Sequence, residues 1–515
     1  MTTNDGDDRG DEAAVTTDES TTGTVRPFTG AEYLDSLADG RDVVIHGERV
    51  KDVTTHPAFA ANARVIAGLY DALWEEPGRS DLTVPTDTGN GGFTHPFFRP
   101  PRSREDLETA RTAIEAWQRR CYGWLGRTPD YKASFLATLG ANAEFYGEYA
   151  PNARRWFTAA QERVLHVNHA LVHPPVDRHL PPDEVRDVYV HAEGDNDAGV
   201  IVSGAKVVAT GSALTHHNFI AHHGMPVQRP EFALAFMAPV DTPGCTILCR
   251  TSYAQSAAAT GSPFDYPLSS RMDENDTIIV FDKALIPWEN VLVYRDVEMA
   301  NGFFHRSGFL PRFALHGATR LAVKLEFIAG LMLRAIEVNG TGDFRRTQAA
   351  VGEVMTWRHT MRALSDAMIH SAGPWTGPYV QPPAEYALAY RVLGPIAYAQ
   401  VRSLVLSTVG SGLIYLNSGV EDFAAPDVRA LLDRYLRGSG GHDAVGRVKV
   451  MKLLWDAVGT EFGGRHELYE RSYAGNEEDT RIQVARGAAG SGLADRMLAL
   501  VDDCMASYDL DGWVD

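Results

Sequence analysis

The hydrophobic pattern changes twice along the chain, and this change constrains the fold more than any other feature. In residues 26–180 and again in residues 300–515, apolar side chains recur every three or four positions, which is typical of helices. Residues 181–299 carry short alternating runs rich in β-branched residues, such as "GVIVSGAKVVAT", "FALAFMAPV" and "TIIVFDKALIPWENVLVYRD". This order predicts an α+β chain in which a central β-barrel or β-sandwich lies between an N-terminal and a C-terminal helical domain.

Residues 1–25 form an acidic tail ahead of the first helical domain. Positions 1–24 hold seven acidic residues and one arginine with almost nothing to bury, so we expect the tail to be disordered. The formal net charge of the chain is −19, and no basic stripe offsets it. We therefore expect neither nucleic acid nor an anionic membrane surface as a partner.

The cellular location follows from what the sequence lacks. No run approaches about 18 uninterrupted apolar residues, so no transmembrane helix is predicted, and the N-terminus has no apolar signal segment. Four cysteines occur among 515 residues, namely Cys121, Cys245, Cys249 and Cys504. Such sparse cysteines are typical of a reducing compartment, and we expect a cytoplasmic protein.

The segment "WLGRTPDY", residues 124–131, joins two predicted helices and carries one fixed positive charge and one phenol. Ser103, followed three positions later by Asp106, predicts a capped helix start. The apolar face of this helix repeats at spacings of three and four: Leu107, Ala110, Ile114, Trp117, Cys121 and Trp124. Gly123 and Gly126 weaken and end the helix.

A second helix is predicted after this turn. Thr128 and Pro129 suit its N-cap and first position, and we expect it to run to about Tyr146. Tyr131 then lies in the first turn, with Arg127 just before it, where free N–H groups and the helix dipole favour a small anion such as a phenolate. The alternative is a structural arginine paired with a carboxylate beside a core tyrosine.

A third helix is predicted over residues 152–172. Its buried face is marked by Trp156, Ala160, Val164, Val167 and Leu171. His169 falls in its last turn, where a helix C-terminus favours a protonated imidazole. A capping or core histidine is the alternative interpretation.

The common metal and nucleotide motifs are absent from the sequence. It contains no phosphate-binding loop, H-E-x-x-H, G-x-S-x-G or paired C-x-x-C motif. Cys245 and Cys249 lie four positions apart on a predicted strand, about 13 Å, too far to share a metal. The adjacent histidines of "HHNFIAHHG" point to opposite faces of a strand. We therefore predict no metal site.

Several long segments, in order along the chain, resemble one family. They include "FTGAEYLDSLADGRDVVIHGERVKDVTTHPAF", "YGWLGRTPDY", "HALVHPPVDR", "PLSSRMDENDTIIVFDKALIPWENVLVYRD" and "FGGRHELYERSYAG". Over residues 26–515 the chain resembles the 4-hydroxyphenylacetate 3-monooxygenase family, large oxygenase component. This family includes chlorophenol monooxygenases and hydroxylases of tyrosyl or β-tyrosyl groups held on carrier proteins.

The resemblance implies a fold and a chemistry. The fold is acyl-CoA-dehydrogenase-like, with a C-terminal four-helix bundle that forms a homotetramer. The cofactor is FAD, supplied as FADH2 by a separate NAD(P)H:flavin reductase, and O2 is the co-substrate. The reaction, through a flavin C4a-hydroperoxide, hydroxylates a para-substituted phenol ortho to its hydroxyl and gives a catechol.

The resemblance also assigns residues. Arg127, Tyr131 and His169 match the residues that hold the substrate phenol; a nearby cation stabilises a phenolate, and a histidine can accept or relay its proton. His223 and Gly224 match a substrate-closing loop whose usual small hydroxyl residues are replaced here. The implied flavin contacts are His169, Ala170, Leu171, Pro175, Val176, Asp177, Arg178, Thr210, Tyr473, Ala474, Gly475 and Asn476.

The substrate stays open at this stage. Candidates are 4-hydroxyphenylacetate, a chlorophenol, tyrosine, or a (chloro-)β-tyrosyl group on a peptidyl carrier protein in antibiotic biosynthesis. One rival is an acyl-CoA-dehydrogenase-type oxidoreductase, and another is a non-catalytic carrier-binding homologue. A 4-hydroxybutyryl-CoA dehydratase shares the fold but needs cluster-binding cysteines, where this chain has Arg127 and Tyr131 and only Cys121 nearby.

Overall fold

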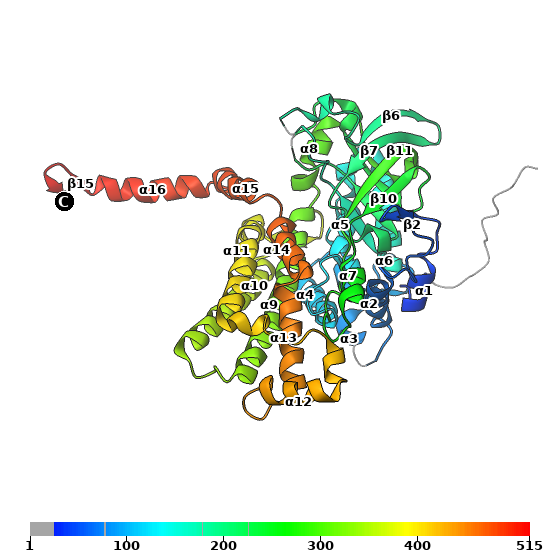
Figure 1. Ribbon diagram of the computed structural model, residues 1–515. Helices are drawn as coiled ribbons and strands as arrows, with labels where there is room; N and C mark the ends of the chain where they lie inside the picture. Colours follow the sequence, from blue (N-terminus) through cyan, green and yellow to red (C-terminus); the bar gives the residue numbers. More distant parts are fainter. Residues whose placement is uncertain (1–24, 77–78, 178, 225, 515) are drawn as a thin grey trace, which may run out of the picture.

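The computed structural model describes residues 25–76, 79–177, 179–224 and 226–514 (Figure 1). The predicted acidic tail, apart from Val25, lies outside the described residues, as does Arg178. Helices precede and follow a region of sheets, so the predicted α+β order is confirmed.

The N-terminal region is mainly helical. Its helices are α1 (Gly30–Asp35), α2 (Ala60–Asp71), α3 (Arg79–Leu82), α4 (Arg104–Arg120), α5 (Ala133–Ala141) and α6 (Ala150–Arg163), with a small hairpin of β3 (Val84–Pro85) and β4 (Phe93–Thr94). The predicted start of α4 is confirmed, because the Asp106 N–H donates to the Ser103 hydroxyl at 3.2 Å and the Ser103 N–H donates back to the Asp106 carboxylate. The predicted apolar face of α4 is buried.

The second predicted helix is shorter than expected. Pro129–Lys132 form a 3-10 turn, and α5 ends at Ala141 rather than near Tyr146. Thr128 makes no capping hydrogen bond; its hydroxyl accepts from the side-chain amide of Gln118 at 3.0 Å instead.

The third predicted helix, over residues 152–172, is wrong in its last part. The backbone at Val164 is left-handed, with φ of 53°, which ends α6, and Val167–Ala170 form strand β5. This strand pairs in parallel with β8, so that His169 lies opposite Phe219. A short strand that is buried on both faces has no alternation to distinguish it from a helix. His169 therefore lies on a strand, and no helix dipole favours its protonated form.

Two sheets form the middle of the molecule. The six-stranded sheet has the order β2 (Glu48–Arg49), β1 (Asp42–Ile45), β10 (Cys245–Cys249), β11 (Thr277–Pro287), β7 (Gly199–Lys206) and β6 (His191–Asn196). The four-stranded sheet has the order β12 (Val291–Tyr294), β9 (Leu234–Pro239), β8 (His217–Ile220) and β5 (Val167–Ala170). Strands β1, β2 and β5 precede residue 181, so both sheets use residues from the N-terminal segment; the domain boundaries at 180 and 299 stay predictions.

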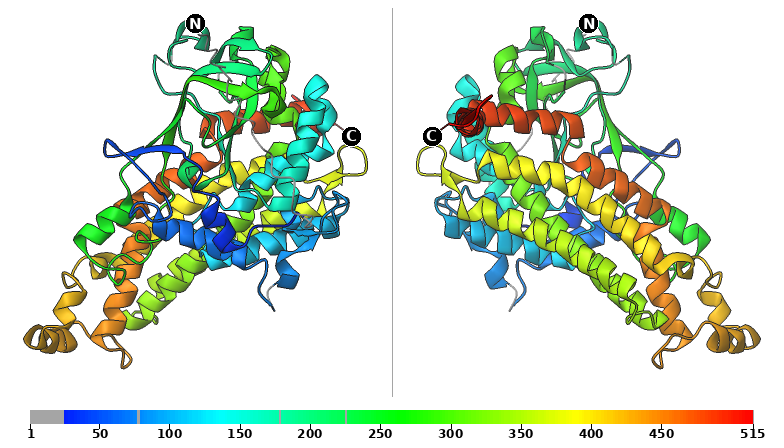
Figure 2. Two further views of the ribbon diagram at one scale, coloured as in Figure 1. Left: turned by 90° about the vertical axis from the view of Figure 1, so that its right-hand side faces the viewer. Right: turned by 90° about the vertical axis from the view of Figure 1, so that its left-hand side faces the viewer.

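Long helices dominate the C-terminal region. They are α8 (Val297–Arg306), α9 (Phe309–Asn339), α10 (Arg345–His370), α11 (Ala384–Val409), α12 (Pro426–Tyr435), α13 (Ala444–Val458), α14 (Glu461–Tyr473), α15 (Glu477–Gly490) and α16 (Leu493–Ala506). This region also contains two short hairpins, formed by β13 (Gly373–Pro374) with β14 (Val380–Gln381) and by β15 (Tyr508–Asp509) with β16 (Gly512–Trp513). One further helix, α7 (Tyr253–Thr260), belongs to the β region. Helices α9, α10 and α11 run side by side and pack with α13 and α14 as a bundle (Figure 2).

One described helix, Ala384–Leu413, is long and apolar enough to cross a membrane by length and composition, which the sequence pattern did not predict. Its α11 part packs against α9, α10 and α14 in the bundle. The most apolar window of this helix is 33% buried, so packing within the chain accounts for part of its composition.

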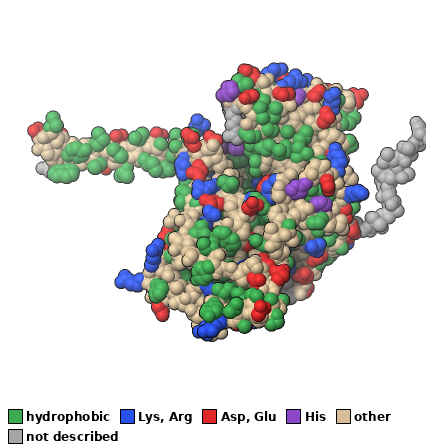
Figure 3. Space-filling model, viewed as in Figure 1, with side chains coloured by type: hydrophobic (Ala, Val, Ile, Leu, Met, Phe, Trp, Pro, Cys, Tyr) green, Lys and Arg blue, Asp and Glu red, His purple; other side chains and the backbone are tan. Residues whose placement is uncertain are grey.

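Helix α15 packs against α11, and α16 extends beyond it, away from the body, as an arm (Figure 1). No residue of α16 is buried. Its exposed apolar side chains are Met497, Leu498, Leu500, Val501 and Met505 (Figure 3). An exposed apolar surface of this kind is typical of an interaction site.

Candidate active site

The loop that follows α4 is pressed against two helices of the C-terminal region. Gly123 has φ of 73°, and a Cβ there would lie 2.6 Å from the backbone nitrogen of Lys324 in α9. A Cβ on Gly126 would lie 1.8 Å from the Tyr469 hydroxyl in α14. Only glycine fits at either position, so the loop that ends in Arg127 lies directly against α9 and α14.

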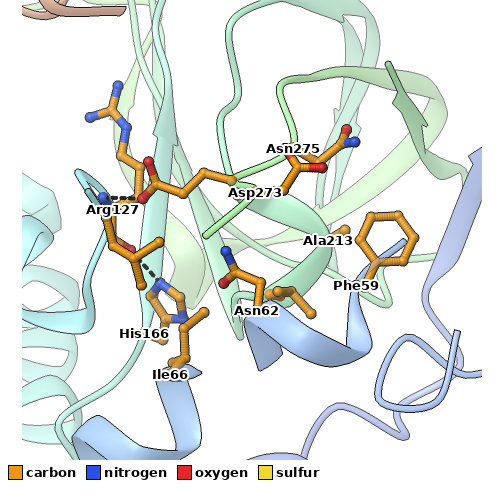
Figure 4. Close-up of a pocket in the computed structure, with 12 residues that line it drawn as sticks. Phe59, Asn62, Ile66, Arg127, His166, Ala213, Asp273 and Asn275 are labelled. Atoms are coloured by element: carbon orange, nitrogen blue, oxygen red, sulfur yellow. Dashed lines mark hydrogen bonds between the residues drawn. The ribbon is translucent and has the colours of Figure 1, made fainter. Parts of the chain in front are cut away.

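The backbone of Arg127 is clamped on both sides (Figure 4). Its N–H donates to Glu274 Oε1 at 2.6 Å, and its carbonyl accepts from His166 Nε2 at 2.9 Å. The space between these residues is only about 10 Å³, room for roughly one water molecule. We therefore interpret this spot as scaffold that orients Arg127 rather than as a ligand site.

The Arg127 guanidinium lies among three tyrosines. Its carbon is 4.2 Å from the ring centre of Tyr131 and 5.7 Å from those of Tyr469 and Tyr473. Its Nε and Nη1 are buried without a hydrogen-bond partner, and it forms no ion pair with a described carboxylate. This contradicts the alternative of a structural arginine paired with a carboxylate. Burial raises the pKa of Tyr131, although Arg127 opposes that rise, so the tyrosine stays a neutral phenol.

The two tyrosines of α14 are held by a buried ion network. Glu470 accepts from Arg320 at 2.7 and 2.6 Å and from Lys324 at 2.8 Å. All three side chains are almost completely buried. Because Arg320 and Lys324 belong to α9, the network fixes α14 and its tyrosines relative to the bundle.

His169 is bonded to a residue that the sequence analysis did not single out. The Lys132 amine hydrogen-bonds His169 Nδ1, while His169 Nε2 makes no hydrogen bond with the described residues. Burial, followed by the charges of Lys132 and Arg127, lowers the pKa of His169 well below its usual value. His169 is thus neutral, which corrects the protonated imidazole expected from a helix C-terminus.

A cavity of about 100 Å³ lies between Arg127 and His169. Phe304, Phe309 and Phe313 form part of its wall. A cavity of about 150 Å³ can hold benzene, so this space is close to the size of one aromatic ring. No described carboxylate lines it.

The far end of this cavity carries His223 and Arg391. The His223 ring centre is 4.5 Å from that of Phe304, and the Arg391 guanidinium is 5.5 Å from the same ring. Arg391 donates from Nε to the Ala474 carbonyl at 2.7 Å and from Nη1 to Gln483 at 2.7 Å. Its Nη2 has no hydrogen-bond partner among the described residues, so it is free to contact a ligand.

A second, larger cleft of about 630 Å³ adjoins the first. Arg250 and Arg465 line it together with Asp276, which accepts from both at 2.7 to 3.0 Å. The exposed apolar residues Leu248, Ile278 and Leu468 line it too. Arg250 also pairs with Asp273 at 2.8 Å, and Arg465 lies 3.7 Å from Glu274. Polar side chains beside apolar surface suit a ligand that combines polar groups with flat rings.

The wall between the two cavities contains a strained residue. Val207 and Val208 line both spaces, and Val208 has φ of 58°. A left-handed backbone is rare for a β-branched residue and costs about 1–3 kcal/mol. Such strain is concentrated at ligand sites, and no pattern in the sequence predicted it.

The predicted flavin contacts are distributed over both cavities. Leu171, Ala474 and Gly475 line the smaller one, Pro175 the larger one, and Tyr473 both. Thr210 lies behind the larger cleft, with its hydroxyl donating to Asp276 at 2.6 Å. Ala170 is buried within β5. Val176, Asp177 and Gly224 are exposed. The Asn476 side chain caps α15 by accepting from the backbone N–H groups of Glu478 and Asp479. Their roles stay predictions.

Family models match most of the chain. The model described as "4-hydroxyphenylacetate 3-hydroxylase N terminal" matches residues 29–293, and "4-hydroxyphenylacetate 3-hydroxylase C terminal" matches residues 300–502. The chain belongs to this family. The family and the acyl-CoA-dehydrogenase-like fold expected from the resemblance are thereby confirmed, and with them the enzyme class, a flavin-dependent monooxygenase.

Individual relatives agree with this assignment. The chain is 57% identical to the oxygenase component of 4-nitrophenol 2-monooxygenase from a Rhodococcus species, covering 95% of this chain and 94% of the relative. It is 54% identical to a Streptomyces globisporus monooxygenase of a (3S)-3-amino-3-(3-chloro-4-hydroxyphenyl)propanoyl group on a peptidyl-carrier protein, covering 96% and 94%.

A solved structure gives the same result for the fold. The oxygenase component of 4-hydroxyphenylacetate 3-monooxygenase, complexed with FAD and 4-hydroxyphenylacetate, has a TM-score of 0.87 at 30% identity over 93% of this chain and 99% of that one. That protein and the nitrophenol relative are named oxygenase components, which implies a separate partner component.

Proposed function

We propose that the chain is the oxygenase component of a two-component monooxygenase that uses FADH2 and O2 to hydroxylate a para-substituted phenol ortho to its hydroxyl. The observation that carries the proposal is the meeting of two cavities at Arg127 and Tyr473. One has the size of a phenol ring and the other the size and polarity of a dinucleotide.

The larger cleft fits FAD. Arg465, whose Nη1 has no hydrogen-bond partner, is available for its phosphates, whereas the nitrogens of Arg250 all donate within the protein. Tyr469 and Tyr473 are available for its ring system. Bound reduced flavin supplies, with O2, the electrophilic oxygen atom that the phenol accepts. The tyrosine hydroxyls of α14 are buried without hydrogen-bond partners, which is consistent with a polar ligand beside them.

The smaller cavity prepares the phenol. An electron-rich phenolate reacts faster with electrophilic oxygen than a phenol does, so the site must stabilise a negative oxygen. Arg127, with two unpartnered nitrogens, supplies the charge and the donors. His169 lines the same space, and its Nε2, which has no hydrogen-bond partner among the described residues, can accept the phenolic proton. The phenylalanine wall excludes water, which strengthens the attraction between Arg127 and the phenolate.

The acyl-CoA-dehydrogenase-type rival needs a carboxylate that removes an α-proton. No described carboxylate lines the smaller cavity, and this observation disfavours the rival. The non-catalytic rival does not account for unpartnered buried groups on Arg127 and the α14 tyrosines.

The substrate class follows from the relatives only in outline. One acts on 4-nitrophenol and the other on a carrier-bound chlorinated hydroxyphenyl group, so we propose a phenol with a para substituent, free or on a peptidyl carrier protein. The free thiols of the described cysteines support a cytoplasmic location.

We further propose a flavin reductase as the partner component and a homotetramer as the working assembly. The exposed apolar side chains of the α16 arm support association between copies of the chain. The assembly is tested by measuring the molar mass of the full chain by light scattering, with a variant that ends before α15 for comparison. A full chain with the mass of a single copy would contradict the proposed tetramer.

The activity is tested by supplying FADH2 through a generic flavin reductase with O2 and a panel of free and carrier-bound phenols. The expected product is heavier by one oxygen atom and is a catechol. If no phenol gains oxygen while an acyl-CoA is oxidised with an electron acceptor, the rival oxidoreductase is correct.

A further inference from the structure

Lys132 is buried without an anion. It is 1% exposed, and it forms no ion pair with a described carboxylate. Lys324, which is equally buried, bonds Glu470 at 2.8 Å. The usual reason for a buried lysine, pairing with a carboxylate, therefore does not apply to Lys132.

The surroundings of Lys132 are two aromatic rings and no carboxylate that pairs with its amine among the described residues. Its amine lies 4.6 Å from the ring centre of Tyr131 and 4.5 Å from that of Phe309. The preceding carboxylate, Asp130, is turned to His316, 3.4 Å away. Burial, and then the charge of Arg127, lowers the pKa of Lys132 well below its usual range. The amine is thus available as a base.

The hydrogen bond to His169 defines what such a base can do. A neutral Lys132 amine accepts from the Nδ1–H of His169, which leaves the lone pair of Nε2 directed at the phenol cavity. The titratable groups around His169 are the Lys132 amine, the Arg127 guanidinium and the His223 imidazole. An imidazolium close to the Arg127 guanidinium is unfavourable, so His169 is suited to pass a proton on rather than to keep it.

We propose that Lys132 is the terminal acceptor of a two-residue proton relay that converts the bound phenol to its phenolate. The phenol O–H bond breaks and its oxygen keeps the electron pair, while a bond forms between that proton and His169 Nε2. The Nδ1–H bond of His169 breaks, and its proton forms a new N–H bond on the Lys132 amine. The relay rests on the proposed function of the same cavity and needs no oxidant.

The relay keeps the buried site balanced in charge. Phenolate formation adds one negative charge beside Arg127, and the ammonium of Lys132 adds one positive charge close by. The rings of Tyr131 and Phe309 stabilise that ammonium by cation–π contact. Since the proton stays within the site, phenol ionisation does not depend on a path to solvent.

The test uses 4-nitrophenol, whose ionised and neutral forms differ in absorbance, with flavin-free protein. Phenolate is measured by absorbance, and proton release by a pH indicator in weak buffer, at a pH below the ordinary pKa of the probe. The variants are Lys132→Met, which keeps the apolar stem, and Lys132→Arg, which cannot accept a proton. Lys206→Met is the matched control, because Lys206 is also buried but bonds the Leu171 carbonyl instead of His169.

The unmodified chain and Lys206→Met are expected to bind the probe as phenolate without releasing a proton. Lys132→Met is expected to hold at least tenfold less phenolate at the same pH, and Lys132→Arg to release about one proton per phenolate bound. Equal phenolate and equal proton release in all variants would overturn the relay alone. Failure of every phenol to bind any variant would overturn the proposed function together with the relay.

Discussion

Replacing Glu470 by glutamine is expected to destabilise the chain and to weaken phenol binding. Burial opposes ionisation of Glu470, but Arg320 and Lys324 outweigh it and lower its pKa to about 2 from the ordinary 4.5. At about 1.4 kcal/mol per pKa unit, this difference corresponds to about 3 kcal/mol. Breaking a buried ion pair costs about 3–5 kcal/mol for the same reason, because the remaining cations lose their anion. Burial already lowers the pKa of Lys324 to about 8, so Lys324 can lose its proton when Glu470 is replaced. This deprotonation should keep the loss of stability near about 3 kcal/mol.

The free energy of unfolding is measured by chemical denaturation, with tryptophan fluorescence as the signal. The dissociation constant of 4-nitrophenol is measured for the same variants. Glu467→Gln is the matched control, since Glu467 lies on the same helix and pairs with Arg402 at a partly exposed site, where about 1 kcal/mol or less is expected. We expect weaker phenol binding only in Glu470→Gln, because Tyr469 and Tyr473 would no longer be held beside Arg127. Equal losses of stability in the two variants would refute the reasoning.

The pH dependence has a defined sign. A carboxylate whose pKa is depressed on folding contributes stability above its unfolded pKa, and that contribution is lost as the pH falls through the folded value. The Glu470 contribution should therefore be complete above pH 4.5 and disappear toward about pH 2. In Glu470→Gln, this part of the acid-induced loss should be missing from a series of unfolding curves.

Three further substitutions test the site. Arg127→Met should lower kcat/KM by about 100- to 1000-fold while FAD binding, followed by flavin fluorescence, stays within a few-fold. Gly126→Ala should lower activity strongly because its Cβ would overlap the Tyr469 hydroxyl, whereas Gly464→Ala, with open space around its Cβ, should not. If Arg391 binds the para substituent of the phenol, Arg391→Gln should raise KM about tenfold for phenols with an anionic para substituent and much less for neutral ones. Equal changes in KM for both kinds of phenol would exclude contact between Arg391 and the substituent.

Part of the site could be predicted from the sequence because it is local. Arg127 and Tyr131 lie four positions apart around one turn, and the distance of 4.2 Å between the guanidinium and the ring agrees with that placement. Lys132 follows directly in the same segment, but its bond to His169 spans 37 positions and depends on β5, which the sequence pattern indicated as helix. Arg391 comes from a distant helix, and no local pattern marked it.

The misplaced His169 shows why element type matters for the chemistry. At a helix C-terminus the imidazole would be a cation and could only stabilise a phenolate that had lost its proton elsewhere. On β5 it bonds the Lys132 amine, and burial followed by the neighbouring basic groups keeps it neutral and able to accept a proton. Arg127 then carries a fixed charge beside the phenolate, and the proton must end on a group that tolerates it. Within the described part of the chain, His169 bonds the Lys132 amine, which meets that requirement, so the strand placement itself leads to the relay.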